Sequence, residues 1–110
     1  MEPNILLIGR GLGTLNILKE ELVKYQRNIF TANSDELIAL NLKNEKIDLI
    51  IVGAGLPNEV KDQMVSQVQI LAPNIPLHIM EKTPGLTPVS MIGYTNEKAI
   101  IWKLQGLNKR

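Results

Sequence analysis

The chain has 110 residues, enough to bury one hydrophobic core and too few for two independent domains, so we expect one domain over residues 1–110. Hydrophobic residues make up 45% and charged residues 21%, a balance typical of a folded globular protein and not of a disordered segment. The net charge of +1 favours neither nucleic acid nor an anionic membrane as a partner.

The first predicted elements are a buried strand and an amphipathic helix. Ile5–Ile8 is a continuous apolar run ended by a glycine, which is typical of a strand buried on both faces of a parallel sheet. A helix capped by Thr14 and reaching Tyr25 is expected to follow. Its buried face is predicted to comprise Leu15, Leu18, Leu22 and Tyr25.

A second strand is predicted at Asn28–Ala32, followed by a helix. Ser34 is a favourable N-cap, and the two acidic residues after it suit the positive end of a helix that reaches Asn44. Ile47–Val52 is the clearest strand of the chain, because it is rich in β-branched residues and is bounded by glycine.

A third helix is predicted from Pro57-Asn58 to Ala72-Pro73, and a fourth strand at Leu77–Met80. The segment Thr83–Pro88 holds two prolines and a glycine, so it is expected to be a loop. The buried side of the third helix is predicted to comprise Val60, Met64, Val65, Val68 and Leu71.

Two structures are compatible with the end of the chain. In the first, Val89–Tyr94 is a fifth strand, and Thr95 or Asn96 caps a final helix. That helix would carry Ile100, Ile101, Leu104 and Leu107. The alternative is a β-hairpin that turns at Thr95–Lys98. The β-prone runs that it would pair are Met91–Tyr94 and Ala99–Trp102.

The alternation of strands and helices predicts an α/β fold. Right-handed crossovers place such elements in a mainly parallel sheet with helices on both faces, a three-layer α/β/α sandwich. Ligands bind such sheets beyond the carboxyl ends of the strands. The segments expected there are Gly9–Thr14, Gly53–Asn58 and Glu81–Gly85.

Five of the eight glycines lie in the first two of these loops. Backbone amides at a helix start, aided by the helix dipole, predict a site for a nucleotide or another small anion. The candidate ligand-binding residues are Gly9, Arg10, Gly11, Gly13, Thr14, Gly53 and Gly55. The alternative is that these glycines only permit tight turns.

The first loop departs from the dinucleotide-binding fingerprint G-x-G-x-x-G. Gly9 and Gly11 match it, but Thr14 stands where the third glycine belongs. The acid expected about 20 residues later is also missing from the end of the second strand, where Ala32-Asn33 stands.

Few residues are available for catalysis. The chain has no cysteine and one histidine, which excludes thiol chemistry, disulfides and multi-histidine metal centres, and we expect no cofactor. His78 lies between apolar neighbours and is expected to be packed in a strand. An enzyme would need Arg10, His78 and Glu81 to converge on one open pocket.

The chain is predicted to be a cytoplasmic protein. No apolar run approaches the roughly 20 residues of a membrane span. The first residues, Met1-Glu2-Pro3-Asn4, lack the basic segment that opens a secretory signal.

As an ordered whole, the chain from Asn4 to about Met80 resembles the receiver domain of bacterial response regulators, a flavodoxin-like five-stranded sandwich. The best local match is the run from Ile47 to Pro57. Pro57 fits a proline that receivers place four residues after their phospho-accepting aspartate, so Gly53 occupies the acceptor position. The chain is shorter than a receiver by about one β/α unit.

The same resemblance implies that the phosphotransfer chemistry is lost. Gly9-Arg10 stands where receivers place the acidic pair that holds Mg²⁺, and Glu81 stands near their switching Thr or Ser. Without those carboxylates neither an acyl-phosphate nor Mg²⁺ is expected. The leading hypothesis is therefore a domain that is no enzyme and that binds a protein, itself included.

The end of the chain is unusually apolar for a domain of this size, which predicts a homodimer or a missing partner. The interface is expected within Val89–Leu107, with Ile101 and Trp102 near a two-fold axis. The candidate interface residues are Met91, Ile92, Tyr94, Ile101, Trp102 and Leu104.

Overall fold

Four parallel strands form one sheet in a computed structural model, which describes the backbone of residues 1–108 and the side chains of residues 1–106. The strands are β1 (Asn4–Ile8), β2 (Asn28–Ala32), β3 (Leu49–Val52) and β4 (Leu77–Ile79). Their order is β2-β1-β3-β4, and all neighbouring strands are parallel. The order reverses between β1 and β3, where sheets of this kind bind ligands.

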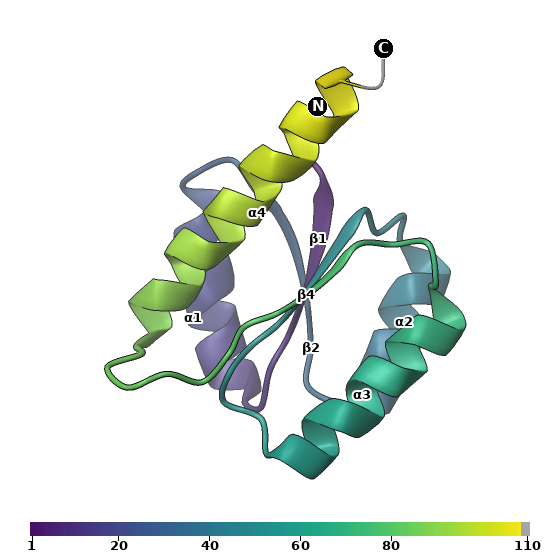
Figure 1. Ribbon diagram of the computed structural model, residues 1–110, viewed down its shortest axis with the longest axis vertical. Helices are drawn as coiled ribbons and strands as arrows, with labels where there is room; N and C mark the ends of the chain where they lie inside the picture. Colours follow the sequence, from purple (N-terminus) through teal and green to yellow (C-terminus); the bar gives the residue numbers. More distant parts are fainter. Residues whose placement is uncertain (109–110) are drawn as a thin grey trace.

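Four helices cover the two faces of this sheet. They are α1 (Leu12–Val23), α2 (Asp35–Asn44), α3 (Asn58–Leu71) and α4 (Pro88–Asn108). Helices α1 and α4 lie side by side on one face, and α2 and α3 lie on the other (Figure 1). The predicted three-layer α/β/α sandwich is confirmed.

The core is divided by the sheet into two layers, because side chains along a strand alternate between faces. The central strands β1 and β3 are apolar on both sides, as the continuous runs in the sequence indicated. Ile5, Leu7, Leu49 and Ile51 face α1 and α4. Leu6, Ile8, Ile50 and Val52 face α2 and α3.

Side-chain capping explains the start of α2 but not that of α1. The Ser34 hydroxyl accepts a hydrogen bond of 3.2 Å from the Leu37 amide, which confirms the predicted N-cap of α2. Helix α1 begins two residues before the predicted cap at Thr14, with Gly11 at the N-cap position and no side-chain cap. Tyr25 lies beyond the end of α1 and is exposed, so its predicted place on the buried face was wrong.

The buried side of α3 is narrower than predicted. Met64 and Val68 are buried and Val65 is partly buried, but Val60 and Leu71 are exposed. Helix α3 contacts the sheet along one narrow stripe, so apolar residues at its margins remain in solvent.

The predicted fifth strand at Val89–Tyr94 and the alternative hairpin were both wrong. A single helix, α4, begins at Pro88 and runs to Asn108. Met91, Thr95 and Ala99 are buried at four-residue spacing, which is the period of a helix. Helix α1 packs against β2 and α4 packs against β3, so α4 covers the half of the face that α1 leaves open. The predicted Leu107 side chain lies outside the described part.

Strand β4 forms an edge of the sheet, since it pairs only with β3 among the described residues. The Tyr94 hydroxyl of α4 donates a hydrogen bond of 3.4 Å to the Ile79 carbonyl of β4. The helix thus occupies one backbone acceptor of this short strand.

Glu2 links the start of the chain to two distant segments. Its carboxylate accepts hydrogen bonds from Arg27, between α1 and β2, and from Lys103 of α4. Arg27 also donates a 2.9 Å hydrogen bond to Asn96 of α4. Burial alone would raise the pKa of Glu2, but the hydrogen bonds from Lys103 and Arg27 lower it overall.

We predict that Glu2→Gln lowers the free energy of unfolding at pH 7 by about 1 kcal/mol, the scale of a partly exposed ion-pair network. Because the folded-state pKa of Glu2 is lowered, its contribution is present above the ordinary glutamate pKa and is lost as the pH falls through the folded value. Urea unfolding from pH 7 to pH 2 measures this. Glu45→Gln, at an exposed position, is the control. A difference that persists undiminished in acid would contradict the prediction.

Candidate functional site

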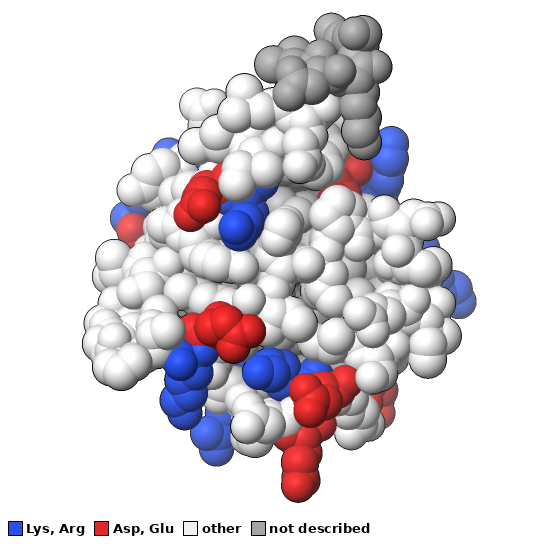
Figure 2. All heavy atoms as spheres, in the orientation of Figure 1, with Lys and Arg blue, Asp and Glu red and all other residues white. Residues whose placement is uncertain are grey.

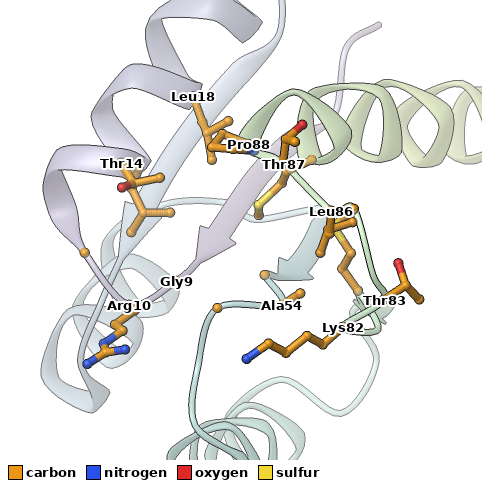
Figure 3. Close-up of a pocket in the computed structure, with 17 residues that line it drawn as sticks. Gly9, Arg10, Thr14, Leu18, Ala54, Lys82, Thr83, Leu86, Thr87 and Pro88 are labelled. Atoms are coloured by element: carbon orange, nitrogen blue, oxygen red, sulfur yellow. The ribbon is translucent and has the colours of Figure 1, made fainter.

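A cavity of about 700 Å³ opens at the carboxyl ends of the strands. The loops after β1 and β3 form one side of it, and the loop after β4 and the start of α4 form the other (Figure 3). It therefore lies at the point where the strand order reverses, the place that the sequence analysis predicted for a ligand.

The structure brings six of the seven predicted ligand-binding residues to this cavity. These six are Gly9, Arg10, Gly11, Thr14, Gly53 and Gly55. Gly13, in the first turn of α1, does not line it. Ligand binding by this set remains a prediction.

Lys82 joins Arg10 at the cavity. In Figure 3 the Lys82 side chain extends from the loop after β4, past Ala54, toward the side on which Arg10 lies. Both side chains are exposed. No Asp or Glu lines the cavity, so its charged groups are both positive.

The inner wall is apolar and comes from several elements. Leu15 and Leu18 belong to α1, Leu86 to the loop after β4, and Met91 to α4, while Met80 follows β4. Leu86 and Met91 were not predicted at the site, because a fifth strand was expected after the loop. Only the four-residue spacing of Met91, Thr95 and Ala99 indicated a helix there.

A close approach between the end of β3 and α4 restricts the residue type at position 53 to one with a very small side chain. A Cβ at this buried position would lie 3.2 Å from the Met91 sulfur and 3.4 Å from the Ile8 carbonyl oxygen. Gly55 differs, because it is exposed and a Cβ there would contact nothing within 4 Å. A larger residue at Gly53 therefore requires a shift of the Met91 side chain, whereas one at Gly55 does not meet a neighbour.

The three residues of the enzyme hypothesis do not converge. Arg10 lines the cavity, but His78 and Glu81 do not. His78 lies in β4 and is partly buried, as expected. Its burial, and to a smaller extent the positive charge of Lys98, lower the pKa of the imidazole. Among the described residues Glu81 forms no ion pair with Arg10.

The predicted interface residues are divided between the core and the surface. Met91 is buried and packs in the core, which removes it from any surface. Ile92 and Tyr94 are partly buried against the same core, and Ile101 and Trp102 are also partly buried. Leu104 is 54% exposed.

Neither a metal cluster nor a membrane span is found in the described part of the chain. No three His, Asp or Glu side chains among those residues gather closely enough to hold a metal ion. None of the helices described there is both long and apolar enough to cross a bilayer.

Comparison with solved structures identifies the class of fold. A CheY-like receiver domain from Methanospirillum hungatei JF-1 is 14% identical, with a TM-score of 0.67, over 94% of this chain and 98% of that one. The receiver domain of a putative Luxo repressor protein from Vibrio parahaemolyticus is 15% identical, with a TM-score of 0.66, over 100% and 99%. An adenylate cyclase structure from Rhodopirellula baltica is 14% identical, with a TM-score of 0.71, over 99% and 96%.

These likenesses show that the chain has the receiver fold, a flavodoxin-like α/β sandwich, here built on four strands. No family model matches the sequence, and no curated protein matches it. At identities this low the common feature is the arrangement of strands and helices, so function has to be argued from the site itself.

We predict that Gly53→Asp lowers the free energy of unfolding by roughly 1–3 kcal/mol, because it places a carboxylate against Met91 and the buried backbone. The matched substitution Gly55→Asp is expected to change it by less than about 0.5 kcal/mol, since that position is open. Chemical denaturation of the three proteins measures both effects. Equal stability of the two variants would show that Met91 yields freely.

Proposed function

We propose that this chain is a receiver-like signalling domain that acts by binding a protein and takes no part in phosphoryl transfer. One observation carries the proposal: the cavity where a receiver would accept a phosphoryl group is lined by Arg10 and Lys82 and by no carboxylate. An acyl-phosphate needs a carboxylate nucleophile, and Mg²⁺ needs oxygen ligands, preferably charged ones.

The packing around the cavity supports the same proposal. The position of the acceptor is Gly53, which Met91 approaches too closely for a larger side chain to fit without a shift. A Cβ at Gly9, where the resemblance places part of the acidic pair, would lie 2.9 Å from a Leu15 methyl carbon. The apolar core thus extends into the space that the acids of a receiver would require.

We predict that incubation with acetyl phosphate and Mg²⁺ adds no phosphoryl group to the protein, because no cavity carboxylate is available. Intact-mass spectrometry measures the product, and an active receiver domain treated in parallel shows that the reagent works. A phosphorylated Asp or Glu at any position would overturn the proposal.

We further propose that the protein partner is a second copy of this chain. Val89, Ile100 and Leu104 are 72%, 50% and 54% exposed and lie with Gly93 along one side of α4. In Figure 2 the surface over α4 is mainly uncharged but carries an acidic and a basic side chain. By helical spacing Glu97, whose side chain is 63% exposed, lies on the same side between Gly93 and Ile100, so the apolar stripe is interrupted there.

In a two-fold symmetric interface each copy presents the same stripe to the other, so no second type of surface is needed. The proposed contact therefore centres on Ile100 and Leu104. Trp102 lies on the side of α4 that carries the buried Met91, Thr95 and Ala99, so it is not part of this stripe.

We predict that the protein sediments as a dimer at high micromolar concentration and that Leu104→Glu weakens self-association at least about tenfold, because it buries a charge in the interface. Ile70→Glu is the matched control, since Ile70 is 79% exposed on α3, on the opposite face of the sheet. Sedimentation velocity distinguishes the two forms. A monomeric parent protein, or equal effects of the two substitutions, would contradict a dimer through α4.

A further inference from the structure

We infer that the cavity binds a small molecule in which one anionic group is attached to an apolar body. This inference does not depend on the proposed loss of phosphoryl transfer or on the dimer. A volume of about 700 Å³ falls in the range of small-molecule sites. An inorganic anion alone would fill only part of this volume. The size of the cavity therefore indicates a ligand that has an apolar ring or chain in addition to its anionic group.

The interior of the cavity fits the apolar body. Leu15, Leu18, Leu86 and the sulfur-containing side chains of Met80 and Met91 line it from both sides. Methionine side chains adapt to ligands of irregular shape. Burial of an apolar ring or chain against these groups supplies the non-directional part of the affinity.

The opening of the cavity fits the anionic group. Arg10 and Lys82 both lie along one edge of the lining, the lower edge in Figure 3, and neither forms an ion pair with another described residue. Helix α1 begins at Leu12, directly beside Gly11 of the lining, so its positive end adds to the same field. No acidic side chain of the lining opposes these charges.

A nucleotide fits this lining less well than a simpler amphipathic anion. The polar side chains other than the two cations are the hydroxyls of Thr14, Thr83 and Thr87. Neither a carboxylate nor a side-chain amide is present to bind ribose hydroxyls or the edge of a base. The chemistry of the wall therefore favours an apolar body over a sugar and base.

Two fluorescent probes of similar shape test this inference. 1-Anilinonaphthalene-8-sulfonate carries a sulfonate on an aromatic body, and N-phenyl-1-naphthylamine has the same body without the charge. We expect the sulfonate probe to bind one site on the native chain at least about fivefold more tightly than the neutral probe. Its fluorescence titration should saturate, and neither inorganic phosphate nor adenosine monophosphate should displace it at millimolar concentration.

Variants of residues that line the cavity test whether the two probes bind there. The double variant Arg10→Gln/Lys82→Gln should weaken the sulfonate probe about fivefold and leave the neutral probe unchanged within about twofold. Lys46→Gln, an exposed cation just before β3 at the opposite end of the sheet, should change neither. Ala54→Leu, which narrows the cavity, should weaken both probes. Circular dichroism and thermal unfolding confirm that each variant is folded.

Three results would overturn the inference. Equal affinity for the two probes, or no loss in the double variant, would remove the role of the anionic group. Binding that Ala54→Leu leaves unchanged would place the probe elsewhere on the molecule. Displacement by adenosine monophosphate would show that the site prefers a nucleotide. None of these results bears on phosphorylation by acetyl phosphate, so the two proposals succeed or fail separately.

Discussion

The close packing of Met91 against Gly53 joins α4 to the sheet at the edge of the cavity. It joins the end of β3 to the first turn of α4, with 3.2 Å between the methionine sulfur and the place of a Cβ. Because α4 is seated so close to the sheet, it completes the core on the face that α1 covers only in part. Both residues of this contact also line the cavity.

The fold could be predicted as far as β4 because each element there has a local signal. Continuous apolar runs marked β1 and β3, and Ser34 marked the start of α2. The last segment could not be assigned in this way. Val89–Tyr94 is β-prone, but the open half of the sheet requires a covering helix, and that requirement appears only when the sheet is assembled.

The part of the candidate site that could be predicted is the pair of glycine-containing loops after β1 and β3. Gly9 and Gly53, in the loops after β1 and β3, are each closely approached by a side chain, and both loops line the cavity. On the opposite wall the predicted segment Glu81–Gly85 supplies Lys82, Thr83 and Gly85. The rest of that wall, from Leu86 to Met91, depends on the start of α4, where a strand was expected. The reason for Gly53 is likewise a contact with a residue 38 positions away, which no local pattern contains.

The hydrogen bond from Tyr94 to Ile79 affects how readily another strand could add to the β4 edge of the sheet. Unpaired edge strands can recruit strands of other molecules and begin fibrous aggregation. Strand β4 has only three residues, and the tyrosine hydroxyl already engages one of its carbonyl groups. An incoming strand would find a short template and a competing donor. Strand β4 is therefore a poorer template for an added strand than a longer edge strand whose carbonyl groups are all free.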